Sequence, residues 1–378
     1  MPETAETTET TETDTTAPML AQSETQDAPD PDLHALHGGH ATPRQEGIVV
    51  ALAPNVFEVM IGQTAYLCQL RGRLRKAHRQ SLQPPPRRSS AQTVPLRGRQ
   101  RFPRNVPSQP DEQTQHPTHI APGDRVQVTM LGPNEGVIED ILPRQTALAR
   151  MRTELGEEQV LMANLTLAVL IFSVSEPTPN LGLLDRYLAL CEHAGVRALI
   201  CLNKIDLGMT DEAREIISLY SGLGYPVLCV SAVTGEGIAD LRARLIGETS
   251  LLTGPSGVGK SSLINVLIPG AGQRTGAISE ATGKGRHTTT GARLLSLPEG
   301  GWIADSAGIR ELALWNTSPD EVAQCFVELR PIADDCEYED CAHDEHAEGC
   351  AIRAALVDGR LAPSRYTNFM RLLAEAQG

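Results

Sequence analysis

The sequence has no long apolar run of the kind that membrane proteins contain, and its N-terminal segment has no basic residues. No stretch offers the about 18 uninterrupted apolar residues of a membrane-spanning helix, and the first residues lack the basic start and apolar run of a secretory signal. We therefore expect a cytoplasmic protein without a membrane partner. There is no Lys or Arg before Arg44, while acidic residues recur from Glu3 to Asp32. This composition predicts a disordered acidic tail over residues 1–45.

Acidic residues are absent from residues 71–104, although the formal net charge of the whole chain is -14. Arginines, one lysine and many Pro, Gln and Ser residues fill this segment, which predicts a long solvated loop. The loop could serve solubility alone. Solubility does not require charge of one sign, whereas phosphate binding exploits it, so we favour contact with nucleic acid.

Disulfide bonds are not expected, because the eight cysteines come without a secretion signal. Four cysteines stand singly in apolar segments and are interpreted as small buried hydrophobic residues: Cys68, Cys191, Cys201 and Cys229. The cysteines near the C-terminus differ, because they form the cluster Cys336-x4-Cys341-x-His343-x6-Cys350. Three thiolates and an imidazole at short spacings favour one tetrahedral, structural Zn²⁺ ion with four protein ligands, although His346 is a rival for the third position.

The remaining pattern predicts three folded regions. Residues 46–158 contain short β-prone runs at 48–52, 56–61, 65–70, 125–130 and 136–141, as in a small antiparallel barrel, interrupted by the basic insertion near 71–118. Residues 159–318 alternate apolar strands (167–174, 197–202, 227–230, 250–253, 302–304) with helices (181–194, after 210, 238–246, 262–267), which indicates a mostly parallel sheet flanked by helices. Residues 319–378 form a C-terminal domain that contains the cysteine cluster.

The strongest motif matches G-x-x-x-x-G-K-[ST] between a predicted strand and a predicted helix, which is the context of a phosphate-binding P-loop. Backbone N–H groups of the loop would surround the phosphates at the helix N-terminus. Lys260 would neutralise the terminal phosphates, and the Ser261 hydroxyl would bind Mg²⁺. The motif and its neighbour are Gly254, Pro255, Ser256, Gly257, Val258, Gly259, Lys260, Ser261 and Ser262.

Base recognition is predicted from the turn Asn203, Lys204, Ile205 and Asp206, which follows a predicted buried strand. In such an N-K-x-D turn the carboxylate accepts from the two donors of the guanine edge, while the lysine packs over the ring. Adenine would leave that carboxylate desolvated and unpaired. The next strand is followed by Ser231 and Ala232, a turn whose backbone can support guanine.

Two further motifs concern Mg²⁺ and the terminal phosphate. The segment from Asp305 to Gly308 matches D-x-x-G, in which the Asp reaches Mg²⁺ through water and the Gly amide contacts the phosphate. The segment 285–290, Gly-Arg-His-Thr-Thr-Thr, offers Thr290 or a neighbouring threonine as a further Mg²⁺ ligand. In an ordinary GTPase the P-loop comes first, whereas here the base-reading turns precede it. Because a site is a spatial object, we predict a circularly permuted GTPase that binds GTP and GDP with Mg²⁺.

From about Glu46 to the C-terminus the chain resembles the small-ribosomal-subunit-dependent GTPase A family (RsgA). Three features carry this resemblance: the permuted order of the GTPase motifs, the GRHTTT segment and the Cys/Cys/His/Cys cluster. The resemblance implies an OB-type barrel, a permuted GTPase domain and a mainly helical zinc domain. It also implies GTP hydrolysis stimulated by the small ribosomal subunit late in its maturation, with rRNA contacts. Similar proteins carry a hydrophobic residue where many GTPases have a catalytic glutamine, here Ile309. His287 then becomes the candidate for positioning water, with a packing role in the switch loop as the alternative.

The sequence departs from the family at Ser306 and Ala307, where Thr-Pro is usual, and in a His343-to-Cys350 interval that is one residue longer. Two other functions remain open: an ATP-dependent P-loop kinase or ATPase, and an RNA-binding scaffold in which hydrolysis is incidental. Near the C-terminus, four residues could contact RNA or simply pack: Arg353, Arg365, Tyr366 and Phe369. We expect a monomer.

Overall fold

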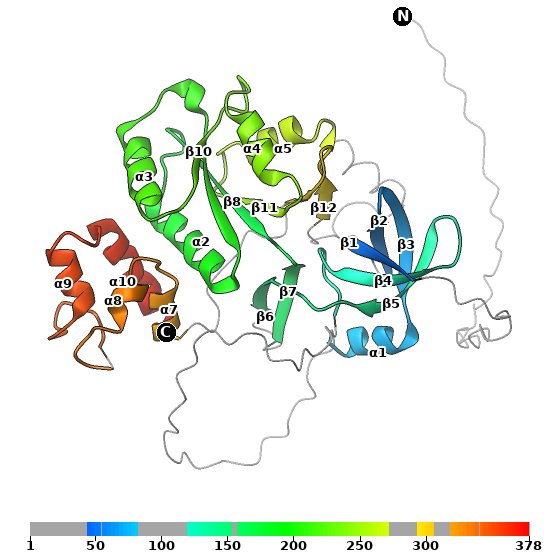
Figure 1. Cartoon of the computed structure of the whole chain (residues 1–378), viewed down its shortest axis with the longest axis horizontal. Helices are drawn as coiled ribbons and strands as arrows, with labels where there is room; N and C mark the ends of the chain where they lie inside the picture. Colours follow the sequence, from blue (N-terminus) through cyan, green and yellow to red (C-terminus); the bar gives the residue numbers. More distant parts are fainter. Residues whose placement is uncertain are drawn as a thin grey trace, which may run out of the picture. The chain divides into compact units, whose positions relative to one another are not determined.

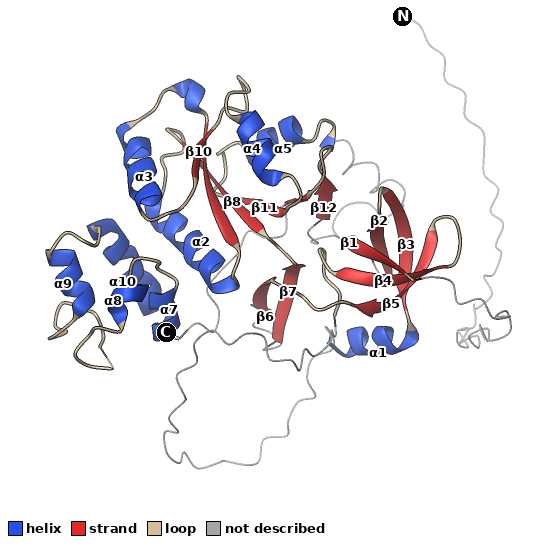
Figure 2. Cartoon of the chain, viewed as in Figure 1, coloured by secondary structure: helices blue, strands red, loops and turns tan. Residues whose placement is uncertain are grey.

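The computed structural model describes residues 44–53, 55–81, 119–152, 157–271, 293–305, 318–339 and 341–377. The acidic tail up to residue 43 and most of the basic insertion, residues 82–118, lie outside the described residues. Figure 1 shows the described elements in chain order, and Figure 2 separates helices from strands. Within the described ranges, no helix combines the length and the apolar character that crossing a membrane requires.

The N-terminal part is a closed barrel in the strand order β1-β2-β3-β5-β4. Its strands are β1 (Gln45–Ala53), β2 (Val56–Ile61), β3 (Thr64–Leu70), β4 (Arg125–Met130) and β5 (Glu135–Ile141). Alternate side chains point inward and form one core, which includes Val49, Phe57, Val59, Val128 and Ile138. The five strands that the sequence predicts here are all present.

The prediction of a solvated loop from Arg71 is wrong for its first residues, because α1 (Gly72–Ser81) is a helix. Straight-chain Arg, Lys and Gln residues are good helix formers. Leu74 packs against the barrel core, and the His78 ring meets the Phe57 ring edge-on at 5.9 Å between centroids. The composition of this segment indicated its positive charge but not its helix. Leu74 and His78, spaced four residues apart, give the helix a face that packs on the barrel.

A two-stranded antiparallel sheet, β6 (Ala147–Arg152) and β7 (Glu157–Ala163), follows the barrel. No strand was predicted for either segment. The central sheet follows in the order β10-β9-β8-β11-β13-β12. Its strands are β8 (Leu167–Ser173), β9 (Arg197–Asn203), β10 (Val227–Cys229), β11 (Thr249–Thr253), β12 (Arg293–Ser296) and β13 (Trp302–Asp305). Strands β8 to β11 and β13 run parallel, whereas β12, which was not predicted, is an antiparallel edge strand.

Helices cover both faces of this sheet (Figure 1). On one face, α2 (Leu181–Ala194) and α3 (Asp211–Gly222) pack on Ala168, Leu170 and Phe172 of β8. On the other face, α4 (Ile238–Leu245) and α5 (Lys260–Leu267) pack on the alternate residues of β8, Leu167, Val169 and Ile171. Local signals set the bounds of α2, since the Asn180 side chain accepts from the Leu183 amide and Gly195, at φ 65°, ends the helix. The bounds predicted for this helix are confirmed.

The C-terminal domain consists of the helices α7 (Pro319–Gln324), α8 (Arg330–Ala333), α9 (Ala351–Val357) and α10 (Pro363–Gln377) around Phe326 and Phe369. Of the four residues left open near the C-terminus, Arg365 and Phe369 are buried and Arg353 and Tyr366 are half-buried, which favours packing. The predicted fold class of barrel, α/β GTPase domain and mainly helical C-terminal domain is confirmed.

The four isolated cysteines occupy the apolar positions that their surroundings predicted. Cys68, Cys191 and Cys201 are buried, and Cys229 is half-buried. Burial raises the pKa of the Cys68 thiol to about 11 and that of Cys201 to about 12. These thiols therefore stay protonated at neutral pH and behave as small hydrophobic residues.

Candidate functional site

Asn203 joins three segments that are far apart in the sequence. It is the last residue of β9 and is 1% exposed. Its Nδ2 donates to the backbone oxygen of Val258 at 2.8 Å, and its Oδ1 accepts from the Ala232 amide at 3.2 Å. The predicted base-reading turns and the P-loop therefore meet at the carboxyl ends of β9, β10 and β11, which is where open α/β sheets bind ligands.

The turn after Asn203 presents one carboxylate to solvent. Lys204 has the left-handed φ of 68°, and its Nζ donates to the backbone oxygen of Glu176 at 2.6 Å. Ile205–Leu207 forms a short 3₁₀ helix, η2, that carries the exposed Asp206.

A single buried hydroxyl fixes that carboxylate. The Ser231 hydroxyl donates to Asp206 Oδ1 at 2.5 Å and accepts from the amides of Val233 and Thr234 at 3.2 and 3.1 Å. Because Ser231 is fully buried, its hydroxyl holds the Asp206 side chain in one orientation. Asp206 itself is exposed, so its carboxylate can still accept hydrogen bonds from further donors.

The loop from Gly254 to Gly259 requires glycine at three positions. Gly254 has φ 151°, and a Cβ there would lie 2.0 Å from the backbone oxygen of Ile171. Gly259 has φ 93°, and a Cβ there would lie 2.4 Å from Asn203 Nδ2. Gly257, at φ 82°, completes the set. No L-residue side chain fits this path without strain, so the glycines bring the backbone close to β8 and to Asn203.

Lys260 opens α5 and turns back over this loop. Its Nζ donates to the backbone oxygens of Gly254 and Pro255 at 2.9 and 2.6 Å. The first turn also carries the exposed Ser261 and Ser262, and the exposed Ser256 lies in the loop itself. Backbone N–H groups at a helix N-terminus next to a lysine form an environment suited to an anion.

The D-x-x-G motif begins at the same edge of the sheet. Strand β13 pairs in parallel with β11, with Leu251 opposite Ala304, so the backbone of Asp305 reaches the carboxyl edge beside the loop. The other switch residues lie outside the described residues: His287, Thr290, Ser306, Ala307, Gly308 and Ile309. In chain order the edge is assembled from β9, β10, β11 and β13, so the predicted base-reading turns precede the predicted P-loop.

Three thiols and one imidazole meet in the C-terminal domain. The ligand atoms of Cys336, Cys341, His343 and Cys350 all lie within 4.8 Å of one another. His343 Nδ1 is 3.7 Å from the Cys336 Sγ and 3.6 Å from the Cys350 Sγ. A tetrahedral zinc with ordinary bond lengths would hold sulfur and nitrogen about 3.6 Å apart. The residues present therefore fit a metal ion.

The structure gathers His343 and not His346 with the thiols. The His346 side chain is 84% exposed, with its ring 3.5 Å from the Glu345 carboxylate. His343 has φ 56°, and its backbone oxygen accepts from the Tyr366 hydroxyl of α10 at 2.7 Å. Sequence spacing could not identify this support from Tyr366, because the contact joins two separate segments of the domain.

Burial also shapes the protonation of this cluster. It raises the pKa of the Cys350 thiol to about 12, the neighbouring thiols add to the rise, and the Arg353 amide, which donates to the sulfur, opposes it. A thiolate here needs a cation, so metal binding must displace a proton.

Comparisons with known proteins agree with this geometry. Residues 141–315 match the family model of the RsgA GTPase. The chain is 43% identical over 258 residues to a protein of Moorella thermoacetica, covering 68% of this chain and 85% of that one. It is 38% identical over 347 residues to a protein of Ectopseudomonas mendocina, covering 90% and 89%. Both relatives are named small ribosomal subunit biogenesis GTPase RsgA.

Two solved structures share the fold. The crystal structure of YjeQ from Thermotoga maritima matches with a TM-score of 0.65 and 30% identity, over 89% of this chain and 99% of that one. YloQ, a circularly permuted GTPase, matches with a TM-score of 0.61 over 91% of this chain and 98% of that one, at 23% identity. Together with the Cys/Cys/His/Cys cluster, these relationships show that the chain belongs to the RsgA family of GTPases.

Proposed function

We propose that the carboxyl edge of β9, β10, β11 and β13 binds GTP and that the chain hydrolyses it there. The observation that supports this most directly is the pair of hydrogen bonds through which Asn203 links the glycine loop to the Ser231-Ala232 turn. One buried side chain thereby sets the spacing between the base-binding and phosphate-binding parts. A pre-formed spacing lowers the entropy cost of binding a nucleotide that spans both.

Base choice rests on Asp206 in this proposal. The exposed carboxylate, oriented by Ser231, accepts from the two donors of the guanine edge, and Lys204 packs over the ring. The same carboxylate would find no pair of donors on adenine, so ATP is disfavoured. Asp206→Asn should therefore weaken GTP binding and reduce the preference for guanine. An unchanged preference would favour the ATP-dependent kinase or ATPase.

Phosphate binding rests on the loop amides and Lys260. When phosphates are present, Lys260 Nζ exchanges its loop carbonyl partners for the terminal phosphate oxygens. Ser261, Thr290 and Asp305 would hold Mg²⁺, which supplies charge neutralisation at the phosphates when bound. The Gly308 amide contacts the terminal phosphate, and His287 positions the attacking water, since Ile309 has no polar group to do so.

The biological setting follows from the relatives' names. We propose that this chain acts in the maturation of the small ribosomal subunit in the cytoplasm, as a monomer, and that the subunit stimulates its hydrolysis. Exposed Arg75 and Lys76 on α1 provide positive charge for rRNA at the start of the basic insertion. The proposal includes a division into a tail (1–45), barrel region (46–158), GTPase domain (159–318) and zinc domain (319–378).

Zinc is the metal we propose for the C-terminal cluster. Thiolate ligands with one imidazole favour Zn²⁺, and four protein ligands leave no open position, so the role is structural. The ion would be held by Cys336, Cys341, His343 and Cys350. It would fix the loop between α8 and α9 by joining four side chains of that segment.

The experiment that tests the function is phosphate release from GTP and from ATP, with and without purified small ribosomal subunits. Strong stimulation confined to GTP is expected. Hydrolysis that subunits do not change would refute the ribosomal role.

A second measurement addresses the RNA-binding scaffold, in which hydrolysis is incidental. Lys260→Ala should abolish release from the subunit and leave RNA binding intact. Unaltered release by this variant would favour the scaffold.

A further inference from the structure

Helix α10 supports the histidine of the Cys/Cys/His/Cys cluster with two side chains. His343 has φ 56°, a backbone conformation that is uncommon for a residue other than glycine. The Tyr366 hydroxyl donates to the backbone oxygen of His343 at 2.7 Å. The Phe369 ring lies beside the His343 ring, with 5.8 Å between the centroids. Both the backbone and the imidazole of His343 are therefore held by α10.

The first and last cysteines of the cluster are held differently, by the loop itself. The Glu337 amide donates to the backbone oxygen of Gly349 at 3.1 Å, which joins the neighbours of Cys336 and Cys350. Gly349 has φ 62°, and a Cβ there would lie 2.3 Å from the Glu337 carboxylate. Only glycine allows this close approach without strain. His343 lies between the two cysteines in the sequence, and its support comes from α10.

The contacts at His343 continue into the core of the C-terminal domain. Phe369 is fully buried, and its ring meets the Phe326 ring edge-on at 5.5 Å between centroids. The Arg365 guanidinium lies over the Phe326 ring at 4.5 Å. A continuous row of side-chain contacts thus leads from the cluster to Arg365, which is 1% exposed. Because protein interiors are close-packed, a displacement at one end of such a row is felt at the other.

Arg365 belongs to a buried polar network that joins α10 to α2. Asp185 of α2 is also 1% exposed, and its carboxylate accepts from three side chains: Arg365 and Asn368 of α10, and Tyr220 of α3. The same guanidinium donates to Glu328. A buried charge that loses its partner is strongly destabilising, so these bonds hold the C-terminal domain on α2 with defined geometry.

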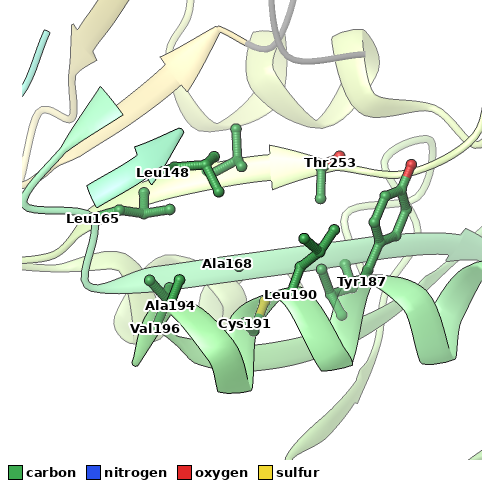
Figure 3. A pocket seen from close by; sticks show the side chains of 11 residues that line it. Leu148, Leu165, Ala168, Tyr187, Leu190, Cys191, Ala194, Val196 and Thr253 are labelled. Atoms are coloured by element: carbon green, nitrogen blue, oxygen red, sulfur yellow. The ribbon is translucent and has the colours of Figure 1, made fainter. Parts of the chain in front are cut away.

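This network uses a face of α2 that does not pack on the central sheet. Figure 3 shows the opposite face, where Leu190, Cys191 and Ala194 meet the strands around an apolar hollow of about 20 Å³. Ala189, by contrast, belongs to the hydrophobic core of the C-terminal domain. Asp185 takes two of its three donors from α10, so its charge is balanced mainly by that helix.

We propose that α10 couples the metal site to α2, so that metal binding and docking of the C-terminal domain on α2 stabilise each other. Tyr366 is the positioning residue on the metal side, and Asp185 is the residue of α2 that holds the other side. The side chains of α10 that make these contacts lie within residues 365–369, about one and a half turns of helix, and cannot shift independently. This inference rests on the proposed binding of Zn²⁺ by the cluster.

The metal side is tested by the affinity of the full chain for Zn²⁺ after Tyr366→Phe, which keeps the ring and removes the hydroxyl. Competition with a chromophoric chelator measures this affinity. Loss of one neutral hydrogen bond should raise the dissociation constant by about twofold to tenfold. Tyr338→Phe is the matched control, because Tyr338 is an exposed tyrosine of the same loop, and it should bind Zn²⁺ like the wild type. An unchanged affinity in Tyr366→Phe would refute the positioning role.

The link to α2 is tested by Asp185→Asn, which removes the charge far from the metal. Coupling between the two sites should raise the dissociation constant for Zn²⁺ by about fivefold or more. Cys191→Ala, on the opposite face of α2, is the control and should leave the Zn²⁺ affinity unchanged. An Asp185→Asn variant that binds Zn²⁺ like the wild type would refute the coupling.

The wild type offers a second readout, because coupling is reciprocal. Removal of Zn²⁺ by a chelator should lower the hydrogen-exchange protection of α2, while α4 on the other face of the sheet should keep its protection. Equal protection of α2 with and without Zn²⁺ would overturn the inference.

Cys341→Ser, measured beside these variants, separates this inference from the proposed metal binding. If Cys341→Ser binds Zn²⁺ as tightly as the wild type, the assignment of the metal site is wrong, and the inference with it. If Cys341→Ser loses Zn²⁺ while Tyr366→Phe does not, only the role of Tyr366 is wrong.

Discussion

Gly259→Ala should damage nucleotide binding through Asn203 and not only through the loop backbone. The new Cβ would lie 2.4 Å from Asn203 Nδ2, at a backbone φ of 93°. The strain of a left-handed backbone costs an L-residue about 1 to 2 kcal/mol. Displacing Asn203 would weaken its bonds to Val258 and Ala232, each worth about 0.5 to 1.5 kcal/mol.

Together these effects amount to about 2 to 5 kcal/mol. The free variant would relax to another loop path, and nucleotide binding would have to reverse that change. This corresponds to an increase in the GDP dissociation constant of about 30-fold to 5000-fold. Titration of the full chain with a fluorescent GDP analogue would measure it. The loss should appear for GDP as well as GTP, since both carry the phosphates next to the loop.

Gly247→Ala is the matched control. Gly247 has φ 75°, but a Cβ there would meet nothing within 4 Å, and it lies beyond the other end of β11. This variant should lose about 1 kcal/mol of stability and keep its GDP affinity. If Gly259→Ala binds GDP within threefold of the wild type, Asn203 does not set the geometry of the site.

Three further predictions concern the stability of the parts that support the site. Arg365→Met should lower the free energy of unfolding by about 3 to 5 kcal/mol, because the carboxylates of Asp185 and Glu328 lose their buried cation. The control Arg360→Met, at an exposed arginine, should change it by less than about 1 kcal/mol. Equal losses of the two variants in urea unfolding would contradict a stabilising role of the buried ion pairs. Burial disfavours the charged form of Glu248, but hydrogen bonds from Thr166 and Arg197 outweigh it and hold the pKa of its carboxyl below the usual value. The wild type should therefore be more stable than Glu248→Gln at neutral pH and lose this difference in stability as the pH falls through the lowered pKa. A difference that increases at acidic pH would show that the pKa of Glu248 is not lowered. Chelation of the metal should lower the melting temperature of the C-terminal domain, with recovery when Zn²⁺ is returned, and a melting curve that chelators leave unchanged would argue against a structural ion.

Much of the central domain could be predicted because its signals are local. The bounds of α2 follow from apolar spacing, a capping Asn180 and a terminating Gly195, all within one segment. The edge strand β12 and the β6–β7 pair were missed, because short strands owe their existence to pairing with distant partners. The helix α1 was missed for a related reason, since its inner face exists only against Phe57 of the barrel.

The candidate site was predictable in its residue types and not in its connections. Motifs predict Gly254, Lys260 and Asp206 as site residues, because phosphate and guanine each demand particular chemistry at fixed spacing, and this assignment stays a prediction. No spacing rule indicates that Asn203 bonds to Val258, or that Arg365 turns inward instead of binding RNA. Such contacts depend on which segments the fold brings together, so they require the structure.

The permuted order has a mechanical consequence for the C-terminal domain. In the sheet the base-reading turns and the phosphate loop keep their places at one edge, because parallel strands present their carboxyl ends together whatever the chain order. What permutation changes is the connection after β13, since only residues 306–317 separate Asp305 from Ser318, which caps α7. The C-terminal domain is thus joined to the end of β13 by the chain after Asp305, and to α2 by the ion pair between Arg365 of α10 and Asp185. A movement of the chain after Asp305 would therefore act on a domain that α2 also holds.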